Sequence, residues 1–464
     1  MHRSIPFSLA LTPLLVAVAS LILSIFVLKL PLFIGLLAGT ITALLIAWRY
    51  GYKRAELMHA VVSGAKSTGN VVIILLIIGV LVPTWLNSGT VAGLVYYGLK
   101  LVSAKYFLIS AFLLTTVTSM ILGTALGTLS TMGVALLGIG FSLGFPKPLV
   151  AGAIISGAFF GDRSSPMSSA ANLAASATGS DFHTMLRHML PTGLAGLILS
   201  AIGYVFLGGS HPALLTTDSS QTLSSALNHF YVINPLVLLA PIIVIALALK
   251  KLPTAYTLGI GLVTGSFLAL FLQKTSLFAW LTAMLYGYQA HSANPTLNAV
   301  FKGGGLVPML SLVILILSAG AFNGIISATG MIGQIAAKLL KRIKTPAGVV
   351  TATVMFSGAT AMVVCNQALP ILLPGQMLTP LYQSRGLKQE TLARTLTDSG
   401  LMLAGLIPWN MLAVLSSATI GVPTLQYAPY ALLLWLLPII TLAVAWLNDK
   451  TPVGRSPLGL TWLK

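Results

Sequence analysis

The chain has 464 residues, of which 56% are hydrophobic and 7% charged, whereas ordinary soluble domains carry about 25% charged residues. The formal net charge of +18 does not indicate nucleic-acid binding, because the 25 Lys and Arg residues are scattered between apolar runs. Those runs are roughly 20 residues long, the length of a membrane-crossing helix, and do not alternate as barrel strands do. We therefore expect an all-α polytopic membrane protein whose partner is the lipid bilayer.

The first apolar run covers residues 7–28. It contains Ala17-Val18-Ala19, which is similar to a signal-peptide cleavage site, but the run is longer than the apolar part of a signal peptide. We therefore expect it to be the first membrane helix. The ten predicted crossings, in chain order, are 7–28, 31–48, 70–86, 106–142 (interrupted), 189–208, 232–249, 254–273, 306–323, 347–380 (interrupted) and 427–447.

Two further segments, 148–185 and 391–422, consist of shorter apolar pieces around Asp162 and Asp398. They are too broken to cross cleanly, so we expect two re-entrant hairpins. Irregular backbone survives at that depth only when protein or a water-filled cavity surrounds it.

Two amphipathic segments, 88–103 and 325–345, are expected to lie along the membrane surface or to form helical arms. Basic residues predict the orientation, because cytoplasmic loops collect Lys and Arg. They place the loop between the second and third helices in the cytoplasm, and the loop 209–231, which has no Lys or Arg, outside. Both termini are then expected to be cytoplasmic.

The pattern of residues 85–107 recurs at 324–346, about 236 to 241 residues later. Each copy is followed by an apolar helix that is interrupted by small polar residues. An Asp motif comes after that helix. An odd number of predicted crossings separates the copies, so the second copy should be inverted, as in secondary transporters. We expect one transmembrane domain, 1–464, with repeat 1 at about 70–208, repeat 2 at about 306–447 and additional helices in 1–48 and 232–273.

Asp162 and Asp398 are two of only seven acidic residues in the chain, and both lie in apolar surroundings. A charge near the bilayer centre costs at least about 2.5–3.5 kcal/mol on insertion scales, so such residues usually mark an ion or substrate pathway. We therefore interpret both as candidate binding residues, with Asp162 as a candidate Na⁺ ligand.

Small polar residues accompany the two acids and the two helix breaks. Hydroxyl, amide and carboxylate oxygens suit Na⁺ or proton relay, whereas helix packing is the alternative role for Ser and Thr. The candidates are Thr124 and Thr128 at the first break, Asn366 with Gln367 at the second, Ser165, Ser168 and Asn172 after Asp162, and Ser399 and Asn410 after Asp398.

Four basic residues are expected to modulate the site. Arg394 lies four residues before Asp398, so the two could form a helical salt bridge, which is the alternative role for Asp398. Arg163 is expected to extend towards the membrane surface. Arg187 and His188 are placed near the inner mouth, where His188 could sense pH or simply be a solvated loop residue.

Five motifs resemble the NhaC-type sodium/proton antiporter family of the ion transporter superfamily. They are STMGVALLGIG, GDRSSPMSSAANLA, DFHTMLRHMLPT, ARTLTDSG and LIPWN, in this order between about residues 50 and 447. The resemblance implies exchange of Na⁺ against H⁺ across a bacterial inner membrane, with acids at Asp162 and Asp398 and with Ser165, Ser168 and Asn172 lining the first motif. Relatives in that family exchange malate and lactate or move amino acids.

The chain departs from this family pattern. Ser169 and Asn366 stand where the family usually has Asp, so two expected carboxylates are neutral. Further departures are Ala170 and Ala171 for Thr, and Ala125-Leu126 for Ser-Trp. Fewer negative ligands should weaken Na⁺ binding, and the arginines would favour an anionic group on the cargo.

The sequence therefore predicts Na⁺/H⁺ antiport by alternating access, in which Asp162 binds either a cation or a proton. The alternative is a Na⁺- or H⁺-coupled exchanger of a small organic solute, such as an amino acid or a carboxylate. An intramembrane aspartyl protease and a passive channel are the remaining classes. We expect no enzymatic activity and no cofactor other than coupling ions, and a homodimer is compatible with the sequence.

Overall fold

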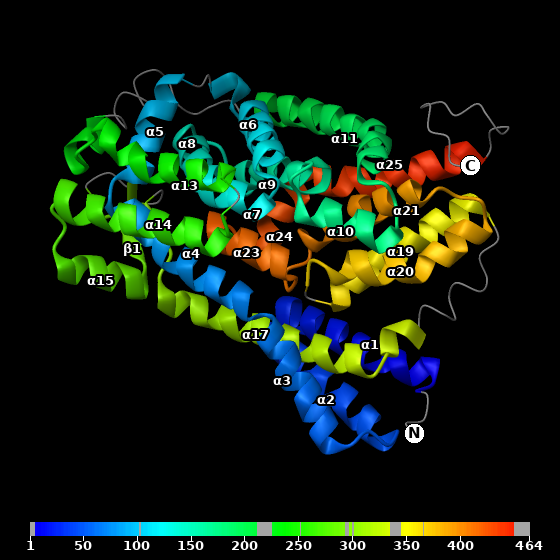
Figure 1. Ribbon diagram of the computed structural model, residues 1–464. Coiled ribbons are helices and arrows are strands. Elements are labelled where there is room, and N and C mark those ends of the chain that lie inside the picture. Colours follow the sequence, from blue (N-terminus) through cyan, green and yellow to red (C-terminus); the bar gives the residue numbers. More distant parts are fainter. Residues whose placement is uncertain are drawn as a thin grey trace.

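The protein is helical almost throughout, as the computed structural model shows (Figure 1). The structure describes residues 5–101, 104–210, 225–250, 252–292, 297–298, 301–334, 345–364 and 366–449. Within these ranges the strands are one antiparallel pair, β1 (Tyr288–Gln289) and β2 (Lys302–Gly303). The prediction of an all-α polytopic membrane protein is confirmed.

Seven helical stretches of the described chain are long and apolar enough to cross a membrane, or eight if one bent pair is counted as a single span. They are Phe7–Leu28, Arg54–Asn87, Ala125–Ser142, Phe182–Ser210, Thr254–Leu272, Leu306–Ala328 and Pro346–Val363. Shorter apolar helices accompany them, among them α2 (Phe33–Arg49), α6 (Phe107–Leu122) and α25 (Leu432–Asp449). Ten full crossings and two re-entrant hairpins stay a prediction.

The N-terminal helices pack with a helix from the middle of the chain. They are α1 (Phe7–Leu23), extended by the π-helix η1 (Ser24–Leu28), then α2, α3 (Arg54–Ser67) and α4 (Gly69–Asn87). α3 packs closely against α17 (Leu306–Ala328), and a Cβ on Gly64 would lie 2.3 Å from the carbonyl oxygen of Gly320. The prediction of a loop between the second and third helices is therefore wrong for residues 54–67.

The first half continues with a run of short helices and ends on a long one. Its elements are α5 (Thr90–Leu101), η2 (Ala104–Tyr106), α6, α7 (Ala125–Thr128), η3 (Leu129–Gly133), α8 (Val134–Ser142), α9 (Lys147–Ser164), α10 (Ser169–Thr178) and α11 (Phe182–Ser210). α9 is an unbroken helix, nearly all of it buried inside the protein. The segment 148–185, predicted to consist of shorter apolar pieces, thus contains α9, α10 and the start of α11, with breaks between them.

A connecting region joins the halves. It comprises η4 (Pro235–Leu238), α13 (Leu239–Leu249), α14 (Thr254–Phe267), η5 (Leu268–Leu272), α15 (Leu277–Tyr286) and the β1–β2 pair. α15 was not among the predicted helices, because its ten residues are too few for a full crossing.

The second half has a similar order of elements. After α17 come α19 (Pro346–Val363), α20 (Leu369–Ser384), α21 (Gln389–Leu396), η6 (Thr397–Leu401), α22 (Met402–Ala404), α23 (Met411–Ile420), α24 (Thr424–Tyr427), η7 (Ala428–Tyr430) and α25. Of the predicted amphipathic segment 325–345, residues 325–328 end α17 and residues 335–344 lie outside the described chain. The other such segment forms α5, whose buried face packs against α8.

Helices α10 and α23 correspond in the two halves. Each has ten residues, and each begins after a polar N-cap, Ser168 or Asn410, whose side chain accepts a backbone N–H. Each ends at a glycine in the left-handed region, Gly179 (φ 68°) or Gly421 (φ 75°). α10 packs against α20 and α21 of the other half, and α23 packs against η3. The two halves therefore contact each other through these short helices. The inverted orientation of the second half relative to the first stays a prediction.

Candidate functional site

Asp162 lies near the C-terminal end of α9 and is only 3% exposed. Its carboxylate accepts hydrogen bonds from neutral groups. Ser168 Oγ lies 3.3 Å from Oδ1 and Gln367 Nε2 lies 3.0 Å from Oδ2. The backbone N–H of Ala125 also donates to this carboxylate. A buried carboxylate held by several neutral donors is a group that can exchange one partner for a cation or a proton.

Three breaks between helices bring these groups together. α9 stops before Pro166, since proline cannot continue the helical hydrogen-bond ladder. α6 ends at Gly123, which has a φ of 69°, and α7 then begins with Ala125, so its N-terminal dipole favours the carboxylate. Gln367 comes from the break between α19 and α20 in the other half. The interrupted helices expected at 106–142 and 347–380 are thus present, and their breaks meet at Asp162.

Asp398 lies in the π-helix η6 and is completely buried. Its Oδ1 forms an ion pair with Arg163 Nε. Its Oδ2 accepts from Thr192 Oγ1 at 3.2 Å and from Thr441 Oγ1 at 2.7 Å. Asp398 is therefore held by a cation and two hydroxyls, in contrast to the neutral donors around Asp162.

Arg163 points into the protein, so the prediction that it extends to the membrane surface is wrong. It is 1% exposed, and its Nη2 donates to Met189 O at 3.1 Å and to Thr192 Oγ1 at 2.9 Å. Burial of a charge is tolerated when the charge is paired and hydrogen-bonded, as it is here. Arg394 is also buried and its charge interacts with that of Asp398, but the ion pair of Asp398 reaches across the halves to Arg163.

Two predicted residues link the segments around Asp162 and Asp398 to the interrupted helices. Ser165 Oγ donates to Met120 O at 2.6 Å, near the end of α6. Asn410 Nδ2 donates to Ala361 O at 2.9 Å, near the end of α19. In both helices the accepting carbonyl belongs to the third residue from the C-terminal end. Ser399, by contrast, donates within its own helix, to Thr395 O at 2.6 Å.

Other predicted polar residues lie around the breaks without a described contact to either carboxylate. Thr124 caps α7, and Thr128 Oγ1 donates to Thr124 O at 2.9 Å. Asn366 Oδ1 accepts from the N–H of Ala368 at 2.7 Å. Asn172 is exposed and donates to Ser168 O at 2.7 Å. Their roles in binding stay predictions.

The two residues expected near the inner mouth differ in their surroundings. Arg187 is exposed on α11. His188 is half-buried, and its Nε2 lies 3.1 Å from Thr391 Oγ1 of α21, so it links the two halves. The alternative of a solvated loop histidine is wrong, because α11 begins at Phe182.

Thr192 and Thr441 contact Asp398 but were not predicted. Each is a polar residue in an otherwise apolar stretch of a membrane helix, Thr192 directly after Pro191 and Thr441 in LLLWLLPIITLAVAW. Thr192 also ends the motif DFHTMLRHMLPT, whereas isolation is the only signal for Thr441. Neither signal names the acid that the hydroxyl meets.

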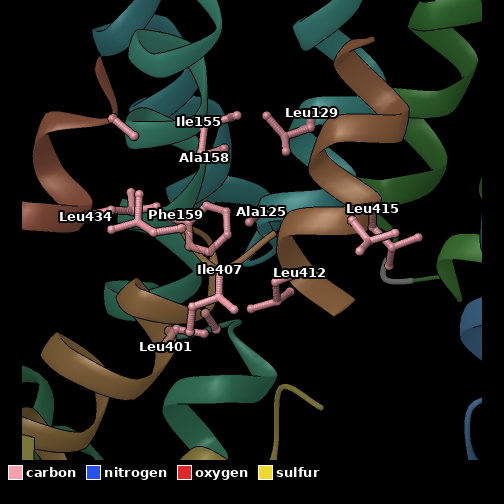
Figure 2. Close-up of a cluster of buried hydrophobic side chains, with 14 of the residues drawn as sticks. Ala125, Leu129, Ile155, Ala158, Phe159, Leu401, Ile407, Leu412, Leu415 and Leu434 are labelled. Carbon is pink, nitrogen blue, oxygen red and sulfur yellow. The ribbon is translucent and has the colours of Figure 1, made fainter. Parts of the chain in front are cut away.

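Apolar side chains from both halves pack beside the site (Figure 2). Ala125 and Leu129 of the first break lie near Phe159 of α9 and Leu412 of α23 in this cluster. The packing is tight, since a Cβ on Gly405 would lie 2.7 Å from Phe159 Cζ. This apolar cluster therefore lies next to the meeting point of the breaks.

A polytopic helical protein in which a buried carboxylate lies where broken helices of both halves meet has the construction of a secondary transporter. Comparison with known proteins agrees. The chain belongs to the Na⁺/H⁺ antiporter family, whose model matches residues 4–209 and 157–448. The predicted family resemblance is confirmed.

Three relatives illustrate the range of this family. The chain is 32% identical to the Na⁺/H⁺ antiporter NhaC of Alkalihalophilus pseudofirmus, with 96% of both chains covered. It is 31% identical to NhaC of Bacillus subtilis, over 90% of this chain and 92% of the relative. It is 28% identical to the malate-2H⁺/Na⁺-lactate antiporter of Bacillus subtilis, over 88% of this chain and 87% of the relative.

Proposed function

We propose that this protein exchanges Na⁺ against H⁺ by alternating access, as a multi-pass protein of a bacterial inner membrane with both termini in the cytoplasm. The observation that carries the proposal is the setting of Asp162, a buried carboxylate whose described partners are all neutral. Similarity to NhaC antiporters over nearly the whole chain supports the same conclusion.

Competition for Asp162 provides the coupling. A Na⁺ ion that binds the carboxylate replaces the donor group of Gln367 or Ser168, and a proton on the carboxylate removes the negative charge that attracts Na⁺. Oxygen ligands for the ion are available nearby in the Ser168 and Gln367 side chains. Because only one of the two cargoes fits at a time, each turnover exchanges one for the other.

Asp398 has a different role in this mechanism. Its charge is compensated by Arg163, so it does not act as a second, equivalent cation site. Arg163 follows Asp162 directly, and a displacement of α9 relative to η6 would strain this ion pair. The pair therefore couples the position of the binding carboxylate to the other half.

The test is Na⁺-driven proton movement in proteoliposomes. We expect Asp162→Asn to reduce exchange to the level of empty vesicles while the purified protein remains folded, because the amide keeps the shape but not the charge. The matched control is Asp181→Asn, which removes an exposed acid before α11 and should leave exchange unchanged. Normal exchange by Asp162→Asn would refute the proposal.

The second candidate is a coupled exchanger of a small organic solute. It is favoured by the neutral residues at positions 169 and 366, and by the similarity to a relative named for malate and lactate. Ser169 opens α10, and Asn366 already accepts the N–H of Ala368. Thermal stabilisation by Na⁺ or Li⁺ alone would favour cation exchange, whereas stabilisation by a carboxylate or amino acid alone would favour the organic exchanger.

A further inference from the structure

A cavity outside the Asp162 site lies where six elements of the fold meet. Its volume is about 60 Å³, several times the roughly 10–15 Å³ that one water needs. Its walls come from α4, α5, α8, the first residue of α9, β2 and the C-terminal end of α23. The charged residues of its described lining are Lys147 and Lys302, and none of that lining is acidic. We call this space the lysine cavity.

The two lysines differ in exposure. Lys147 is half-buried, and its Nζ lies 4.6 Å from the ring centroid of Phe141, another wall residue, whereas Lys302 is exposed. Lys302 is fixed by the pairing of β2 with β1, and Gly305, just beyond it, donates its N–H to Gly79 O at 2.6 Å. Both side chains line the same cavity, so their like charges oppose each other there.

The position of Lys147 is unfavourable for the helix that carries it. It is the first residue of α9, where the helix dipole is positive and disfavours a cation. Helix stability therefore does not explain it. Two mutually repelling ammonium groups beside a positive helix end instead create a field that attracts an anion.

The lysine cavity borders a second, smaller one. This deeper cavity, about 10 Å³, shares Val82, Val134 and Thr419 with the lysine cavity. Ser130 also lines it, and within the described chain the Ser130 hydroxyl, 3% exposed, has no hydrogen-bond partner. Ser130 belongs to η3, which follows the first helix break. The cavities therefore extend from the lysines towards the interrupted helix of the site.

We propose that the lysine cavity is an anion-binding vestibule that takes a small free carboxylate between Lys147 and Lys302. The cavity has room for a carboxylate group and a few further atoms, and its apolar walls, such as Val82 and Leu137, suit a short carbon chain. The alternative role for the lysines is to neutralise the C-terminal carbonyls of α23, which also border the cavity.

Residue-resolved lysine labelling tests the vestibule. The purified full-length protein is acetylated in the presence of lactate, of the neutral analogue lactamide, or of chloride at equal ionic strength, and each lysine is quantified by mass spectrometry. We expect lactate, but not lactamide, to slow the labelling of Lys147 and Lys302 several-fold. Lys105, exposed in η2, is the internal control and should react equally in all three.

A substitution of Lys302 distinguishes anion binding from neutralisation of the C-terminal carbonyls of α23. In Lys302→Gln the protection of Lys147 by lactate should disappear, whereas Lys105→Gln should keep it. Equal labelling of Lys147 in lactate and lactamide, or protection that persists in Lys302→Gln, would overturn the vestibule and leave the neutralising role. Chloride protecting as well as lactate does would also overturn the carboxylate assignment. Labelling reports equilibrium occupancy, so these outcomes do not depend on whether the protein exchanges Na⁺ for H⁺.

Discussion

Arg163 follows one buried aspartate in the chain and forms its ion pair with the other, Asp398, which lies 235 residues further on. This contact joins α9 to η6 and so ties the two halves together in the interior. It also makes the two acidic motifs unequal. Asp398 is neutralised within the protein, while Asp162 keeps neutral partners and remains available to a cargo.

The first prediction concerns this ion pair. Asp398→Asn leaves the buried Arg163 charge without its counter-ion, and breaking a buried pair from one side costs about 3–5 kcal/mol. We expect a loss of that size in the free energy of unfolding, measured by steric trapping in bicelles. The double variant Arg163→Gln/Asp398→Asn should recover part of the loss, because it also removes the Arg163 charge, while the Arg394 charge stays in both variants. A double variant as unstable as the two single losses added together would show that the residues are not coupled.

The ion pair between Arg163 and Asp398 could not be predicted from the sequence. The apolar run 7–28, the interrupted helices and the two Asp motifs are local patterns, and the structure contains all of them. Spacing along one helix favoured Arg394 as the partner of Asp398, since residues four apart share a helix face. The contact with Arg163 depends instead on how α9 packs on η6, and no local pattern encodes it.

Helix α3 was missed for a related reason. Its sequence, RAELMHAVVSGAKS, is too polar to predict a membrane helix, and its basic residues predicted a loop. Its main packing partner is α17, where Gly64 closely approaches Gly320, a residue more than 250 positions away in the chain. The sequence thus singles out Asp162 as a candidate, but the buried contacts that distinguish it from Asp398 could not be predicted.

The second prediction concerns positions 169 and 366, where the family usually has Asp and this chain has Ser and Asn. Asp at position 366 can accept the N–H of Ala368 as Asn366 does, and Asp at position 169 is favoured at the start of α10. A nearby charge contributes at most about 4 kcal/mol at an effective dielectric of 20. We expect Asn366→Asp to lower the KM for Na⁺ about 10-fold, equivalent to about 1.4 kcal/mol. Ser169→Asp should act in the same direction.

The control for this prediction is Gln383→Glu. It adds the same charge on an exposed side chain near the C-terminal end of α20, the helix that follows Asn366. Na⁺-dependent proton fluxes in proteoliposomes give the KM of each variant. A shift in Gln383→Glu as large as that in Asn366→Asp would mean that the added charge acts on the protein generally and not on the site.

The third prediction concerns the close approach of α9 and α6 beside the binding carboxylate. A Cβ on Gly161 would lie 2.1 Å from the backbone carbon of Ser119, so Gly161→Ala must push the two helices apart. Overpacking of this kind typically costs about 1–3 kcal/mol. We expect that loss in unfolding free energy together with a marked fall in exchange rate, because Asp162 moves with α9.

Gly259→Ala is the matched control for Gly161→Ala. Gly259 lies within α14, and a Cβ there meets no atom within 4 Å. Alanine is the better helix former by roughly 1 kcal/mol, so this variant should be as stable as the parent or more stable. Equal losses in the two variants would contradict a specific role for the contact between Gly161 and Ser119.

The last prediction concerns the hydrogen bonds that Ser165 and Asn410 donate to carbonyls near the C-terminal ends of α6 and α19. Ser165→Ala leaves the Met120 carbonyl without its donor, and Asn410→Ala does the same to the Ala361 carbonyl. A buried acceptor left unsatisfied costs about 1–3 kcal/mol, so we expect each variant to lose stability in that range by steric trapping. Thr264→Val, which removes an exposed hydroxyl bonded within α14, should lose much less. Asn410→Ala also removes the N-cap of α23, so its loss should be the larger by about 1 kcal/mol. A loss confined to one half would argue against equivalent roles of Ser165 and Asn410.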